Sequence, residues 1–194
     1  MRNTRVLVMA EVALAIALAA VLNYIGLHFL PQGGSFSLVM LPLMVVALRR
    51  GVIAGVTAGA LYGVIDYIMN PYVVHPIQPL LDYPLAFAAV GLAGLFSHAW
   101  NRAVAKGDTA RAVWTVVLPA TIVGAGARYA LHVLSGYVFF SEYAPPGQPV
   151  IIYSIIYNAT YMIPSAIACA AGVRIQLPAL RNVGVTIPSA ATER

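Results

Sequence analysis

Long apolar segments alternate with short polar gaps along most of this chain of 194 residues. About 20 apolar residues in a helix are enough to cross the roughly 30 Å hydrocarbon core of a bilayer. The pattern predicts six helical segments, at about residues 6–30, 36–48, 51–69, 80–100, 112–136 and 150–173. The second is short for a span, so we expect a tilted or partly re-entrant element there.

The gaps contain residues that break helices. Residues 31–35 read Pro-Gln-Gly-Gly-Ser, residues 70–79 contain prolines, and residues 137–149 are rich in aromatic residues and proline. We see no internal repeat and no sign of a second folded domain. The chain is therefore predicted to be all-α, with a six-helix membrane domain at residues 1–175 and a polar cytoplasmic tail at residues 176–194.

Composition agrees with a membrane protein. Hydrophobic residues make up 61% of the chain and charged residues only 9%, whereas a soluble domain carries about 25% charged residues. We therefore expect a polytopic protein of the cell membrane, embedded in the lipid bilayer. The single cysteine, Cys169, excludes an intramolecular disulfide.

The basic residues predict the orientation of the chain in the membrane. Ten of the eleven Lys and Arg residues lie at the N-terminus or after the second, fourth and sixth segments, and the eleventh is Arg128 within the fifth. Basic residues accumulate on the cytoplasmic side of membrane proteins. Six transmembrane helices with both termini cytoplasmic satisfy this rule at every gap. The net charge of +5 is thus explained by topology, and we expect no nucleic acid partner.

Charged and polar side chains inside the apolar segments are the candidates for function. A carboxylate at membrane depth costs about 3 kcal/mol on insertion scales and usually marks a binding or transport site. Asp82 begins the fourth segment, Tyr83 follows it, and Gln78 lies one helical turn before it. On the fifth segment, Arg128 and His132 share a face at i, i+4 spacing.

The last segment carries a polar stripe formed by Ser154, Asn158, Tyr161 and Ser165, and Tyr153 opens it from the outer side. Further aromatic residues that could form flat walls are Tyr62, Phe139, Phe140 and Tyr143. A pocket with a carboxylate, amide and imidazole groups and several rings suits a planar, cationic or nitrogen-rich ligand.

Two features allow a purely structural interpretation. Asp82 could pair with Arg128 as a structural ion pair, and Asp66 is a competing partner for the same arginine. In the first segment, Ala13 and Ala17, like Ala15 and Ala19, have the spacing that lets another helix approach closely. That helix could belong to this chain or to a partner.

Catalytic and metal-binding patterns are absent from the sequence. We find no His-Glu-x-x-His, no Gly-x-Ser-x-Gly, no cluster at metal-ligand spacing and no Walker motif. We therefore expect no enzyme activity, no metal and no cofactor. The alternatives of a different class are an intramembrane enzyme and a scaffold subunit without a ligand.

Several blocks of sequence, in order, resemble one family of membrane proteins. They are GGS at residues 33–35, LPLMVVALRRG at 41–51, HPIQPLLDYPLAF at 75–87, GLAGLF at 91–96, RYALHVLSG at 128–136, FSEYA at 140–144 and YSIIYN at 153–158. The family is the thiamine-specific S-component of energy-coupling factor (ECF) vitamin transporters. The resemblance extends from about Glu11 to Gly172.

This resemblance implies a six-helix protein that binds thiamine from outside, with the outer loop between the first two helices as a lid. It also implies partners: an ECF transmembrane coupling protein and two ATPase subunits. In the family, small residues on the first helix contact the coupling protein, and they match Ala13 and Ala17. A thiamine precursor or analogue as ligand, or a stand-alone facilitator, is the alternative within this class.

The residues expected to bind the ligand follow from the resemblance position by position. They are Asp82, Tyr83, His132, Phe140, Tyr153, Asn158, Gln78 and Tyr62. Relatives can place tryptophan in the first outer loop, where this chain has Gly33 and Gly34, so Phe36 becomes the nearest candidate ring. Phe140 replaces a tryptophan of some relatives and offers a weaker face to a cation.

Overall fold

The computed structural model describes residues 4–27, 30–106 and 112–182, the last seven by their backbone alone. These residues are helical apart from turns, loops and one isolated β-bridge between Leu27 and Phe36. The elements are α1 (Thr4–Tyr24), η1 (Pro31–Gly33), α2 (Met40–Arg50), α3 (Val52–Met69), α4 (Gln78–Leu80), η2 (Leu81–Leu85), α5 (Ala86–Val90), η3 (Gly91–Phe96), α6 (Ser97–Lys106), η4 (Val113–Val117), α8 (Leu118–Phe139), η5 (Ser141–Tyr143) and α9 (Val150–Asn182).

Each of the six predicted segments is helical. Within the described ranges, five helices are long and apolar enough to cross a membrane: Thr4–Tyr24, Val52–Met69, Gln78–Lys106, Val113–Phe139 and Val150–Ile175. The third of these is one continuous rod built from α4, η2, α5, η3 and α6. The all-α, polytopic prediction is therefore confirmed, with α2 as a shorter sixth helix.

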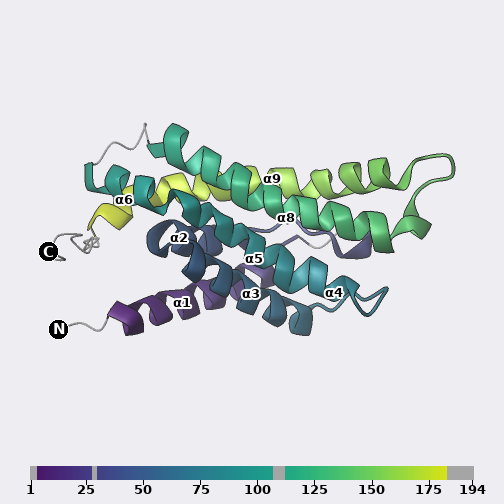
Figure 1. The fold of residues 1–194 in the computed structure, drawn as a ribbon, viewed down its shortest axis with the longest axis horizontal. Coiled ribbons are helices and arrows are strands. Elements are labelled where there is room, and N and C mark those ends of the chain that lie inside the picture. The colour runs from purple at the N-terminus through teal and green to yellow at the C-terminus, as the bar shows by residue number, and fades with distance from the viewer. Residues whose placement is uncertain (1–3, 28–29, 107–111, 183–194) are drawn as a thin grey trace, which may run out of the picture.

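The helices run side by side, and the start of α1 and the end of α9 lie at the same end of the bundle (Figure 1). The connections at residues 70–77 and 140–149 lie at the opposite end. This arrangement is what an even number of passes requires. The cytoplasmic location of both termini stays a prediction.

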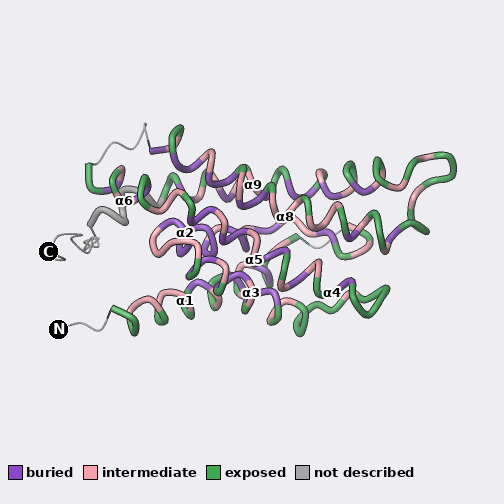
Figure 2. The backbone as a smooth tube through the Cα atoms, in the orientation of Figure 1, coloured by how far each residue is buried: buried purple, intermediate pink, exposed green. Residues whose placement is uncertain are grey.

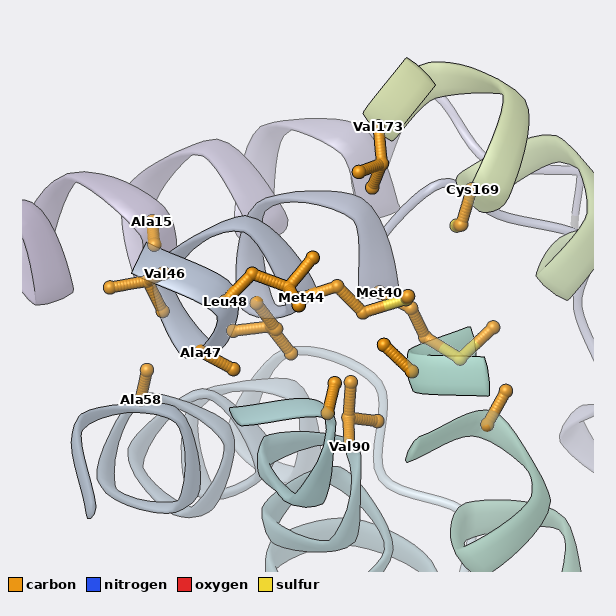
Figure 3. Packing of buried hydrophobic residues seen from close by; sticks show 14 of the residues in the cluster. Ala15, Met40, Met44, Val46, Ala47, Leu48, Ala58, Val90, Cys169 and Val173 are labelled. Carbon is orange, nitrogen blue, oxygen red and sulfur yellow. The ribbon is translucent and has the colours of Figure 1, made fainter. Parts of the chain in front are cut away.

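Helix α2 occupies the centre of the bundle. Its 11 residues give a length of about 16 Å, roughly half the hydrocarbon thickness. It is apolar on all sides, as expected for a helix surrounded by others, and Met40, Met44 and Leu48 are fully buried. Figure 2 shows much of α2 in the colour of buried residues. Figure 3 shows the cluster, in which α2 packs against residues such as Ala15 of α1 and Val90 of α5.

The predicted second segment begins late because its first residues are tied down elsewhere. Leu27 and Phe36 exchange backbone hydrogen bonds of 2.9 and 3.1 Å, which also end the first helix at Tyr24 rather than near residue 30. The Ser37 amide donates to Ser165 Oγ on α9 (3.3 Å). These contacts hold the chain extended until α2 begins at Met40.

Helices α2 and α3 meet at a corner formed by Gly51 alone. Its φ of 90° and ψ of −178° belong to a region that only glycine adopts readily. Just before this corner, Arg49 and Arg50 both bond to Glu11 of α1, with closest N–O distances of 3.0 and 2.6 Å. The ion cluster joins α1 to α2 at the end of the bundle where α1 starts.

Glycines let α3 approach the Gln78–Lys106 rod closely. Gly55, Gly59 and Gly63 repeat every four residues, and a methyl group added to any of them would overlap atoms of the rod. At Gly59 the overlapping atom is the carbonyl oxygen of Phe87. Small residues at this spacing permit such contact between membrane helices. The contact brings η2 beside the C-terminal half of α3.

A local π-helical turn, η2, carries Asp82. Pro84 has no N–H and cannot continue the regular bonding pattern, and the Ala86 amide donates to Leu81 O five residues back. Such π-turns often occur at functional sites. Here the turn places Asp82 and Tyr83 on the inner side of the rod.

The predicted boundary between the membrane domain and the tail does not coincide with the end of a helix. Helix α9 continues without a break to Asn182, so the predicted boundary between residues 175 and 176 falls inside it. Residues 183–194 of the predicted tail lie outside the described residues. The division into membrane domain and tail therefore stays a prediction.

Candidate ligand-binding site

An open cavity of about 780 Å³, with the solvent space at its mouth included, lies in the half of the bundle away from the start of α1. Its lining combines aromatic rings with a few polar and charged groups, as in small-molecule sites. It is lined by Asn23 of α1, residues of the 30–39 segment, Asp66 of α3, Gln78, Asp82, Tyr83 and Phe87 of the rod, Arg128, His132 and Gly136 of α8, Phe140, and Tyr153, Ser154, Tyr157, Asn158 and Tyr161 of α9.

Asp82 is the centre of a hydrogen-bond network on one wall of this cavity. Its Oδ2 accepts from Gln78 Nε2 (2.5 Å) and from Ser135 Oγ (2.8 Å). Its Oδ1 lies 3.1 Å from His132 Nδ1. Buried carboxylates need such partners, and only 15% of this side chain is exposed. The network holds the carboxylate in one orientation beside the cavity.

Arg128 reaches this network through His132. Its Nε donates to His132 Nε2 at 3.2 Å, and its guanidinium carbon lies 3.9 Å from the centre of the Phe87 ring. An arginine can only donate, so Nε2 must accept and the imidazole proton is on Nδ1. Arg128 is therefore connected to Asp82 through His132, which lies between them along the wall.

Asp66 adds a second carboxylate to the cavity from α3. Asn23 Nδ2 of α1 donates to Asp66 Oδ1 at 2.6 Å, and Asn70 Nδ2 lies 3.4 Å from the same oxygen. The Asn23 side chain is buried. This contact joins α1 and α3 where both reach the cavity.

The 30–39 segment covers the cavity and is bonded to α9. Tyr157 accepts a hydrogen bond from the Gly34 amide (3.1 Å) and donates one to the Pro31 carbonyl. Tyr153 lies 3.5 Å from Gln32 Oε1. Gln32 and Gly33 both have positive φ, 56° and 82°, which makes a sharp turn over the pocket.

A second cover comes from the loop at residues 70–77 and from Phe140 with its neighbours. Tyr83 accepts from the Tyr72 amide (2.8 Å) and donates to Asn70 O (2.9 Å). The Tyr72 ring stacks on Phe140 with centres 6.1 Å apart, and its hydroxyl lies 3.2 Å from that of Tyr143. This hydrogen bond, together with partial burial, raises the pKa of Tyr72 to about 12. Tyr72 is thus neutral at physiological pH.

The structure brings most of the residues singled out in the sequence to this one cavity. Those that line it are Asp82, Tyr83, His132, Phe140, Tyr153, Asn158 and Gln78. Tyr62 lies one layer beneath, fully buried and edge-on to Phe87 at 4.7 Å. Phe36 lines a separate apolar hollow with Leu27 and Leu38. Neither ring faces the main cavity.

Sequence reasoning missed Asn23, Gln32 and Tyr157, and considered Asp66 only as an ion-pair partner. Tyr157 had a usable signal, because it lies four residues from both Tyr153 and Tyr161 and so continues one aromatic face of the helix. Asn23 and Gln32 had none, because a single amide near the end of an apolar segment is unremarkable by spacing.

Comparison with known proteins agrees with this architecture. The family model described as thiamine transporter protein (Thia_YuaJ) matches residues 9–183. The chain is 45% identical over 163 residues to the thiamine transporter ThiT of Bacillus subtilis, covering 82% of this chain and 84% of that protein. It is 32% identical over 161 residues to the thiamine transporter ThiT of Lacticaseibacillus paracasei, covering 81% and 80%.

The fold also matches a solved structure. ThiT from Listeria monocytogenes superposes with a TM-score of 0.86 at 29% identity, over 93% of this chain and 98% of that one. Its relatives are transporters rather than enzymes, and the apolar helices make this chain a multi-pass protein of the plasma membrane. Motifs, fold and cavity lead to one conclusion: the chain belongs to the thiamine transporter protein family.

Proposed function

We propose that this chain is the thiamine-binding membrane subunit of an ECF-type importer and captures thiamine from the outer side. Expected ligand contacts are the seven predicted residues that line the cavity, with Tyr157 and the 30–39 segment as its cover. The observation that carries the proposal is the charge of the cavity wall.

Among the described residues that line the cavity, the charged ones are Asp66, Asp82 and Arg128, and His132 is neutral in the observed hydrogen-bond arrangement. Their sum is one negative charge. A buried net charge is costly unless the ligand compensates it. Thiamine carries one permanent positive charge on its thiazolium ring and therefore completes the balance.

The remaining walls suit the two flat rings of thiamine. Phe87, Phe140, Tyr153, Tyr157 and Tyr161 contribute aromatic faces, which attract planar and cationic groups. Asn158 is already bonded to Ser154 O (2.9 Å) and Tyr161 Oη (2.5 Å), so its position is fixed before a ligand arrives. A preorganised site loses less entropy on binding.

Thiamine titration of the purified protein in detergent, by calorimetry or intrinsic fluorescence, tests the proposal. Asp82→Asn keeps the shape and removes the charge, and we expect it to weaken binding about 100-fold, since a charged hydrogen bond contributes about 2–3 kcal/mol. Glu142→Gln is the matched control, because Glu142 is an exposed carboxylate outside the cavity. Wild-type affinity in both Asp82→Ala and His132→Ala would refute the assignment.

The same titration separates thiamine from its precursors. The uncharged pyrimidine half of thiamine has no thiazolium to balance the wall, so we expect it to bind much more weakly than the whole vitamin. Tighter binding of that precursor would move the assignment to precursor uptake.

Energised uptake needs partners, namely the ECF transmembrane coupling protein and two ATPase subunits. The supporting observation is that the small residues of α1 divide between two faces. Ala15 and Ala19 are buried against the core, whereas Ala13 and Ala17 are exposed. The buried pair thus suits packing within this chain, and the exposed pair is available to a partner helix.

Reconstitution in liposomes tests this coupling. Thiamine uptake should require ATP and the partner subunits, and a stand-alone facilitator would instead transport without them. Ala13→Trp should abolish ATP-driven uptake and leave thiamine binding unchanged. Ile122→Trp, at an exposed position of α8, is the control for adding an indole to the lipid-facing surface.

A further inference from the structure

Arg128 is a strongly basic side chain inside a site that we assign to a cationic ligand, and the proposed function does not explain its presence. A positive charge there should oppose binding of another. Its geometry suggests a role directed at the histidine instead. The guanidinium is held over Phe87 at 3.9 Å and donates through Nε to His132 Nε2 at 3.2 Å.

We propose that Arg128 is a positioning residue that holds His132 as the neutral tautomer with its proton on Nδ1, so that His132 donates to Asp82 and takes up no second proton at physiological pH. This inference rests on the proposed function, in which Asp82 is the counter-charge of the ligand. Its consequence is that the charge of the cavity wall stays constant as pH falls, so that only the titration of the ligand itself changes the affinity.

The argument follows from donors and acceptors. With Arg128 donating to Nε2, the lone pair that would receive a second proton is occupied. Protonation would break that hydrogen bond and place two positive charges side by side. Without Arg128, nothing on the same helix occupies Nε2, and the imidazolium would form a direct ion pair with Asp82, 3.1 Å away. Asp82 would then be neutralised before the ligand arrives.

The groups around the imidazole are consistent with this role. The charged and titratable groups that face it are Asp82 from η2, Asp66 from α3, Arg128 from α8 and the Tyr161 phenol from α9, whose ring lies 6.3 Å away edge-on. Two carboxylates favour a protonated histidine, and Arg128 is the one cation among the described residues of this wall. Arg128 is therefore the charged group of this wall that opposes a second proton on His132.

The test compares the pH dependence of thiamine affinity in wild type, Arg128→Met and Arg128→Lys. Wild type should follow the titration of the ligand alone. In Arg128→Met, Nε2 of His132 loses its donor and can take up a proton as pH falls, so affinity should fall about tenfold more than in wild type between about pH 8 and about pH 5.5. Arg128→Lys keeps a cationic donor and should restore the wild-type profile.

Nitrogen NMR of histidine-labelled protein reports the tautomer directly. The chain has four histidines, so His132→Gln assigns the signal. We expect a protonated Nδ1 and an unprotonated Nε2 in the ligand-free wild type. A proton on Nε2 there, a histidine-like titration of wild-type affinity, or a wild-type profile in Arg128→Met would each overturn the inference. This NMR measurement uses the ligand-free wild type. It therefore tests the inference even if thiamine does not bind or if Arg128→Met does not fold.

Discussion

Replacing Tyr157 with phenylalanine removes one oxygen atom from the site and leaves the ring in place. That oxygen makes the two hydrogen bonds that fasten the 30–39 segment to α9, from the Gly34 amide and to the Pro31 carbonyl. Each such bond contributes about 1 kcal/mol net. Its loss should therefore destabilise the closed position of the segment by about 1–2 kcal/mol.

A change of that size alters an equilibrium about 5–30-fold. If the segment is the lid through which thiamine leaves, Tyr157→Phe should speed dissociation by this factor and change association much less, since opening precedes release. Stopped-flow fluorescence, with a large excess of competing unlabelled ligand or dilution to start release, measures the dissociation rate.

Tyr129→Phe is the matched control. The Tyr129 hydroxyl donates to Ile155 O of α9 at 2.8 Å, and this residue neither lines the cavity nor contacts the 30–39 segment. Its dissociation rate should stay within about twofold of wild type. An unchanged rate in Tyr157→Phe, or an equal effect in both variants, would show that these hydrogen bonds do not hold the ligand in.

Other substitutions test the fold that supports the site. Gly59→Ala should lower the free energy of unfolding by about 1–3 kcal/mol, because the new methyl overlaps the Phe87 carbonyl. Gly126→Ala is the control: nothing lies within 4 Å of the added methyl, so this change should be neutral or stabilising by up to about 1 kcal/mol. Thermal unfolding in detergent compares the two variants, and equal losses of stability would contradict the packing argument. Glu11→Ala should destabilise the protein by about 1–2 kcal/mol, because Arg49 and Arg50 lose the carboxylate that they share. Thiamine affinity should not change. A loss of affinity without a loss of stability would contradict a structural role for Glu11.

The membrane segments were predictable because each depends on local sequence. A helix in lipid must satisfy its own backbone hydrogen bonds, so hydropathy alone locates it, and even the shortness of the segment that became α2 was visible as a short apolar run. The cost of burying charge identified Asp82 in the same way. The spacing showed that Arg128 and His132 share a face, but interhelical distances are not local, so it could not show that His132, rather than Arg128, contacts Asp82.

Tyr62 and Tyr157 show where local reasoning ended. Both are tyrosines in apolar segments, yet one is buried under Phe87 and the other bonds to the cover of the cavity. The linear sequence predicts the number of helices, their approximate ends and the candidate functional carboxylate, because all three depend on the free energy of transfer from water to lipid. Which side chains face the cavity was decided by the rotation of each helix about its axis. For α3, close contacts of Gly55, Gly59 and Gly63 with residues far along the chain restrict that rotation.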